Sequence, residues 1–148
     1  KDGFLTCTAN MDYSWVWATK NMYGLVEFYY NSLGEKDSAS ALENPAMTDR
    51  LGRGELFTLG RYYLAAEIHA ELHPLFNLFL TAITNLEDRS VIFQPRAAWN
   101  LAQNIEFVFG AQMYAGETGS EFGGVTLPGT DFVHKSPDSV FAWVTWYF

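Results

Sequence analysis

Three side chains that can bind a metal or carry a proton occupy every second position: Glu67, His69 and Glu71. In a β-strand, residues two apart point to the same face, with their Cβ atoms about 6–7 Å apart. A metal ion could bridge two of them, but a zinc site needs a third or fourth ligand with bonds of about 2 Å. The sequence contains no second group of such residues. We therefore predict no metal site and no cofactor here.

A second candidate for chemistry is His134, in a segment with several hydroxyl and carboxyl side chains. Its neighbours of these kinds are Thr118, Ser120, Asp131, Ser136 and Asp138. The chain has no G-x-S-x-G motif, and no spacing places a nucleophile beside a base. We interpret His134 as a loop residue and His73 as a turn residue before Pro74. The protein is not expected to be an enzyme.

The composition excludes several classes of protein. A formal net charge of −8 leaves no basic stripe to neutralise phosphates, so we expect no nucleic-acid partner. The single cysteine, Cys7, excludes an intrachain disulfide. No run of about 18 apolar residues is present, so no transmembrane helix is available. The aromatic residues, 17% of the chain, are spread among polar ones, which is typical of strands with one apolar and one polar face.

Alternation of apolar and polar residues with period two predicts an all-β fold of seven antiparallel strands. The predicted strands are Phe4–Trp17, Asn21–Ser32, Glu55–Leu72, Leu75–Asn85, Val91–Ala102, Asn104–Ala115 and Ser139–Phe148. In the third strand, Leu56 and the even-numbered residues from Tyr62 to Leu72 form the apolar face. Because proline cannot donate to a strand ladder, we expect a β-bulge at Gln94–Pro95.

Short and longer connections alternate along the chain. Short turns are predicted at Ala18–Lys20, His73–Pro74 and Gln103, and longer loops at Leu33–Gly54, Gly116–Asp138 and, of intermediate length, Leu86–Ser90. If Phe148 is placed at the periplasmic end, every short turn falls on that side and every longer loop on the other. Antiparallel up-and-down transmembrane β-barrels alternate in this way. The stretch Ser38–Arg50 could contain a helical turn.

The last ten residues contain an alternating apolar pattern that ends in phenylalanine. It consists of Val140, Ala142, Val144, Trp146 and Phe148. This pattern resembles the C-terminal strand signature of Gram-negative outer-membrane β-barrel proteins, and the stretch from Gly60 to Gly116 is similar to the late strands of porin-like barrels. The resemblance implies a passive porin-like or transport-associated barrel in the outer membrane of a Gram-negative bacterium, in contact with lipid. It also implies that Val140, Val144, Trp146 and Phe148 are recognised by the barrel assembly machinery.

The odd number of strands makes a further prediction about closure. Seven strands place the start of the first strand and Phe148 on opposite sides of the membrane, whereas bacterial single-chain barrels have an even number. We expect this chain to be part of a larger barrel, completed by upstream strands or by other chains. The alternatives are an eighth strand inside Leu33–Gly54 or, less favoured, a seven-stranded ring with one parallel seam.

On this interpretation, the polar face of the strands lines the barrel interior. The candidate lining residues are Asp12, Glu27, Arg61, Glu67, His69, Glu71, Arg96 and Glu106. Charges inside a narrow barrel must pair or meet water, so we expect the two arginines to pair with Glu67 or Glu106. The face would then brace the wall or select solutes by charge. Two other functions stay open: a small structural or adhesion barrel that binds partners through its outer loops, and a soluble lipocalin-like ligand-binding barrel.

Overall fold

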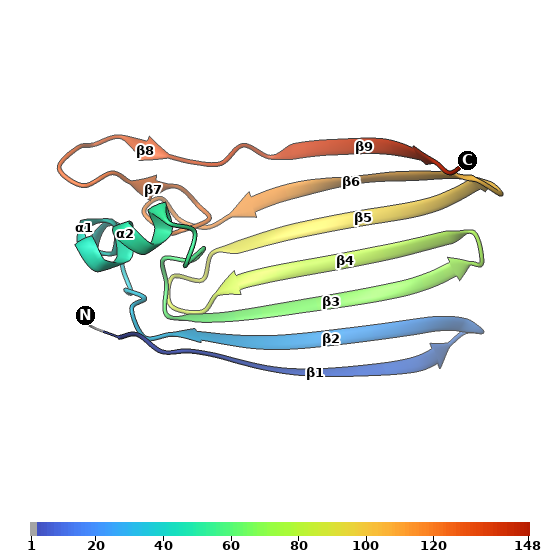
Figure 1. Ribbon diagram of the computed structural model, residues 1–148, viewed down its shortest axis with the longest axis horizontal. Coiled ribbons are helices and arrows are strands. Elements are labelled where there is room, and N and C mark those ends of the chain that lie inside the picture. The colour runs from blue at the N-terminus through green and yellow to red at the C-terminus, as the bar shows by residue number, and fades with distance from the viewer. Residues whose placement is uncertain (1–2) are drawn as a thin grey trace.

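The computed structural model describes residues 3–148, which form one seven-stranded antiparallel sheet (Figure 1). Its strands are β1 (Thr6–Trp17), β2 (Lys20–Asn31), β3 (Tyr62–His73), β4 (Phe76–Asn85), β5 (Val91–Ala102), β6 (Ile105–Ala115) and β9 (Ser139–Trp146). They lie side by side in the order of the sequence. The predicted all-β, antiparallel, seven-stranded architecture is confirmed.

The two ends of the sheet differ. The tight hairpin turns and the C-terminus lie at one end, called the turn end below (Figure 1). The helices α1 (Ser38–Glu43) and α2 (Pro45–Gly52) and the longer loops lie at the other, the loop end. The loop after β6 also contains a small hairpin of β7 (Val125–Thr126) and β8 (Val133–His134). The predicted separation of short turns from longer loops is therefore confirmed.

Two short helices occupy the segment in which the alternative prediction placed an eighth strand. The Asp37 side chain accepts a hydrogen bond from Ala39 N at 3.2 Å, and that of Asn44 accepts one from Ala46 N at 3.0 Å. These are N-cap contacts, and Pro45 at the first position of α2 also favours a helix start. The helical turn predicted in Ser38–Arg50 is confirmed, and the eighth strand is wrong.

A cluster of buried apolar side chains lies at the loop end. Ala41, Met47 and Leu56 are at most 2% exposed, and Phe4 packs against them with other partly buried residues. Because Leu56 is buried among the helices, the predicted third strand from Glu55 is wrong, and β3 begins only at Tyr62. Phe4 likewise belongs to this cluster and precedes the first residue of β1.

The hydrogen-bond register sorts the strand residues into two faces. On one, called the apolar face, a row of directly paired residues runs Met11, Val26, Ala66, Ala82, Phe93, Met113. The next rows toward the turn end include Ile68 with Leu80, and Ala97 with Phe109. Among the described strands, the single charged residue with this parity is Lys20, at the turn that begins β2. The parity predicted for the apolar face is confirmed in all seven strands of the sheet.

Within residues 3–148, no second layer of helices or strands covers the apolar face. Met11 is 74% exposed and Val140 is 86% exposed, although both are large apolar side chains within strands. A sheet in water normally buries its apolar face against helices or another sheet. Within residues 3–148, each strand of the seven-stranded sheet contacts neighbouring strands of that sheet and neither of the two helices.

The predicted β-bulge at Gln94–Pro95 is wrong. Phe93 pairs with Met113 and Arg96 with Gly110, so the register with β6 is the same before and after the proline. Pro95 lies within the ladder to β4, opposite Leu80. The missing N–H is accommodated by a gap in the pairing with β6, without an extra residue. The two register shifts, between Glu71 and His73 and between Asn100 and Ala102, lie beside turns.

The outer edges of the sheet are formed by β1 and β9. Within the described part of the chain, β1 pairs with β2 and β9 pairs with β6, and the two edge strands do not pair with each other. The sheet is open in this structure, as predicted for the chain alone. Both edge strands run from the loop end to the turn end (Figure 1).

Candidate functional site

The polar face of the sheet carries seven of the eight side chains predicted to line an interior. They are Asp12, Glu27, Glu67, His69, Glu71, Arg96 and Glu106. The residue-by-residue pairing of the strands places all seven side chains on the same face of the sheet. These residues come from β1, β2, β3, β5 and β6. The structure thus brings residues up to 94 positions apart (106 − 12) onto one surface.

Arg61 is the exception, and its predicted place on this face is wrong. It precedes β3, and its guanidinium donates to the Gly34 carbonyl, with Nη2 at 3.0 Å and Nε at 3.2 Å. Its backbone N–H donates to the Glu87 carboxylate at 2.8 Å. Arg61 therefore joins two loops at the loop end and does not line the strands.

The predicted ion pairs on the polar face do not form. The Arg96 guanidinium lies over the Phe79 ring, 4.3 Å from its centroid, and Phe79 stacks on His69 at 4.4 Å. Glu67 accepts instead from the Thr81 hydroxyl at 2.8 Å. In residues 3–148, the salt bridges join Arg50 and Arg53 to Glu55 in a loop.

The register explains why these pairs are absent. Arg96 lies opposite Phe79 on one side and Gly110 on the other, whereas Glu106 lies opposite Asn100 and Thr145. Five carboxylates therefore remain on the strands of this face, against one arginine. They belong to Asp12, Glu27, Glu67, Glu71 and Glu106. The polar face carries an excess of negative charge.

Glu67, His69 and Glu71 form one row, as predicted, and each contacts a neighbouring strand. His69 Nε2 lies 2.8 Å from the Asn77 side-chain oxygen, and Glu71 accepts from the Asn21 amide at 2.8 Å. Among residues 3–148, no group of three or more histidine, cysteine or acidic residues is placed to hold a metal ion. His134 is exposed on β8, and no described hydrogen bond joins it to the nearby hydroxyl or carboxyl groups.

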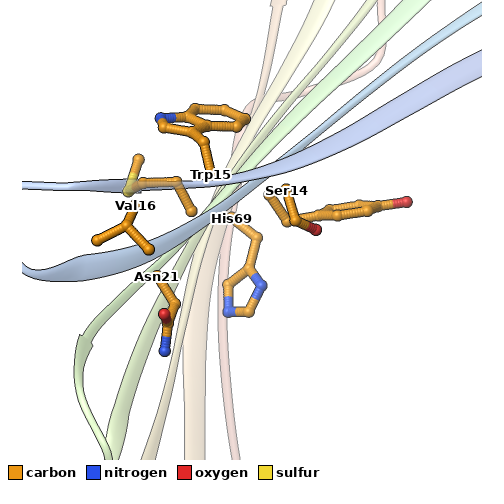
Figure 2. A pocket seen from close by; sticks show the side chains of 7 residues that line it. Ser14, Trp15, Val16, Asn21 and His69 are labelled. Atoms are coloured by element: carbon orange, nitrogen blue, oxygen red, sulfur yellow. The ribbon is translucent and has the colours of Figure 1, made fainter.

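A shallow hollow lies at the turn end of the β1–β2 edge (Figure 2). Trp15 reaches it from the apolar face, whereas His69 and Asn21 lie on the other side of the strands. Because its lining comes from both faces, this hollow does not belong to the polar face alone. We assign no ligand to it.

A partly buried carboxylate at the loop end, that of Glu121, was missed by sequence reasoning. Glu121 accepts hydrogen bonds from Leu59 N at 2.9 Å, from the Asn85 amide at 2.9 Å and from the Tyr63 hydroxyl. Its own N–H donates to the Asp88 carboxylate at 2.7 Å. Glu121 thus ties the loop after β6 to the segment before β3 and to the loop between β4 and β5.

Close packing of side chains in this cluster is possible because position 60 is a glycine. A Cβ atom added to Gly60 would lie 2.4 Å from the Asn85 amide and 2.8 Å from the Tyr63 hydroxyl. Gly60 N donates to that hydroxyl at 2.5 Å. No motif spacing connects Glu121 to Tyr63 and Asn85, which lie 58 and 36 positions away in sequence.

Burial raises the pKa of the Glu121 carboxyl above its usual range, and the hydrogen bonds donated to it only partly offset that effect. This cluster lies at the loop end, where Tyr63 of β3 and Asn85 of β4 meet the loop after β6. It holds the loops over the adjoining part of the polar face.

Comparisons of the chain with protein-family models, curated proteins and solved structures gave no match. In the described part of the chain, no helix is long and apolar enough to cross a membrane.

The raised pKa of Glu121 predicts a pH dependence of the loop attachment. A carboxyl whose pKa is higher in the folded state stabilises that state fully below the unfolded value, about 4.3, and loses this contribution as pH rises through the folded value. We expect hydrogen-exchange protection of Leu59 N–H, corrected for intrinsic exchange rates, to fall with rising pH. Glu121→Gln, which cannot ionise, should remove this dependence. Protection that rises with pH in the wild type would contradict the assignment.

Proposed function

We propose that this sheet is part of the wall of a transmembrane β-barrel, with its apolar face against lipid and its polar face toward a lumen. The observation that carries the proposal is the uncovered apolar face. Its exposed residues include Met11, Val26, Ile68, Phe93, Phe109 and Val140. Contiguous apolar patches larger than about a few hundred Å² are rare on proteins surrounded by water. In a bilayer, the same face needs no protein cover.

The dimensions of the strands support the proposal. Strands β1 to β6 contain 10 to 12 residues, and a tilted transmembrane strand needs about 9–11. Such a strand satisfies its backbone hydrogen bonds through its neighbours, as hydrocarbon requires.

Aromatic side chains on the apolar face gather toward both ends of the strands. Those at the turn end include Trp15, Phe76, Trp99, Phe107 and Trp146. At the loop end, Tyr30 and Tyr62 pack with ring centroids 5.4 Å apart. Two aromatic belts flanking an apolar band are the arrangement that bilayer interfaces favour.

The role we propose is a passive one, porin-like or transport-associated, in the outer membrane of a Gram-negative bacterium. The excess of carboxylates on the polar face would favour cations over anions in the lumen. Val140, Val144 and Trp146 alternate with polar-face residues along β9, and Phe148 follows the strand. We include recognition of these four residues by the barrel assembly machinery in the proposal.

The two open edges require partner strands in this setting, because unpaired backbone groups cost several kcal/mol each in hydrocarbon. An antiparallel partner of β1 or β9 must run from the turn end to the loop end. In a second copy of the sheet with its loops on the same side of the membrane, the edge strands also run from the loop end to the turn end. They could therefore pair with β1 or β9 only in parallel. We therefore propose that both edges pair with strands different from those described here.

Arginine substitutions test which face meets lipid. Phe109→Arg, on the apolar face in the middle of β6, should destabilise the protein in vesicles by ~2–4 kcal/mol if Phe109 lies near the bilayer midplane. Gln112→Arg is the matched control on the polar face of the same strand, and it should cost less. Denaturant titration of vesicle-inserted protein measures both. Equal costs at the two positions would count against the proposal.

Cys7 provides a probe of the edges. In a parallel seam between copies, two β1 edges would bring Cys7 of one copy toward Cys7 of the other, and a β1–β9 seam would place Cys7 and residue 140, near the start of β9, along the same contact. We expect Val140→Cys protein in vesicles to form no disulfide-linked oligomers under oxidation. Tyr30→Cys is the positive control, because Tyr30 pairs with Cys7 in the same chain and an internal disulfide should form. A ladder of linked oligomers would show that copies close the edges.

A further inference from the structure

We propose that the loop-end part of the polar face binds a small organic cation that has an aromatic or apolar body and an ammonium group. A pocket of about 390 Å³ lies between the sheet and the segment Glu55–Thr58. This volume is within the range of roughly 300–1,000 Å³ that small-molecule sites occupy. The proposal rests on the pocket itself and does not require the membrane setting.

The floor of the pocket is an apolar row that ends in a carboxylate. Ala65, Ile83 and Ile92 pair with one another across β3, β4 and β5. Glu27 on β2 pairs with Ala65 at the end of that row. An elongated ligand along the row would therefore place one end at Glu27 and its apolar body over the two isoleucines.

One wall of the pocket is aromatic and held in place. The ring centroids of Tyr29 and Tyr63 are 6.1 Å apart, and those of Tyr63 and Phe122 are 6.4 Å apart. Tyr63 is 3% exposed, and its hydroxyl is fixed by Gly60 N and by Glu121. Aromatic faces attract cations and pack against apolar groups, so the chemistry of this wall suits the proposed ligand.

Charge complementarity selects a cation. Two carboxylates line the pocket, and that of Glu55 is already paired with Arg53, with the nitrogen and oxygen 2.7 Å apart. Glu27 is partly buried, and its carboxylate has no side-chain hydrogen bond or ion pair in residues 3–148. A partly desolvated carboxylate favours a charged donor, and a ligand ammonium can supply it. An anionic ligand would meet repulsion at the same point.

The experiment measures binding of 2-phenylethylamine, protonated at pH 7, to the detergent-solubilised chain by titration calorimetry. We expect saturable binding that Glu27→Gln weakens about ten-fold. Glu106→Gln, which removes a carboxylate from the opposite end of the same face, should leave the affinity unchanged. Neutral 2-phenylethanol and anionic 3-phenylpropionate should bind more weakly than the amine.

A second variant covers the case in which the glutamate substitution disturbs the fold. Ala65→Phe fills the pocket floor and should abolish amine binding while the circular dichroism of the sheet is retained. The proposal is overturned if the wild type shows no saturable amine binding, if Glu27→Gln binds the amine as tightly as the wild type, or if 3-phenylpropionate binds equally well. Because insertion into vesicles is not needed for this measurement, its failure would leave the proposed membrane role untouched.

Discussion

The hydrogen-bond register between neighbouring strands determines which side chains share a face, and the other features of the molecule depend on it. A slip of one residue in the pairing of β2 with β3 would move charged side chains into the apolar face. The register places Ile68 opposite Leu80 and Glu67 opposite Thr81, and the same parity continues to both edges. The two register shifts lie beside turns, so they leave the middle of the sheet undisturbed.

Because the apolar face is uncovered, the buried apolar cluster lies in the loops at one end of the sheet. Carboxylates there accept hydrogen bonds from backbone N–H groups of other loops: Glu87 from Arg61, Asp88 from Glu121 and Glu121 from Leu59. These contacts fix the loops relative to the strands. They also fix Tyr63, and through it the aromatic wall of the pocket we propose.

Most of the fold could be predicted from the sequence, because alternation along a strand is a local signal. The prediction was wrong where a residue fits the alternation of a strand but lies outside that strand in the structure. Leu56 fits the alternation of β3 but is buried among helices, and Arg61 fits the polar face but joins two loops. The Glu121 cluster could not be predicted, because its partners are brought together only by the pairing of distant strands. Pro95 suggested a bulge because proline removes a hydrogen bond, yet the ladder tolerates a gap without a register change.

The central claim is that one face of the sheet meets lipid and the other does not. Trp99 on the apolar face and Trp143 on the polar face lie at nearly the same level near the turn end, and their exposures are similar, 45% and 48%. In vesicles whose acyl chains carry bromine, we expect the fluorescence of a variant that retains only Trp99 to be strongly quenched. A variant that retains only Trp143 should be quenched little. Equal quenching of the two, or stronger quenching of Trp143, would contradict the account.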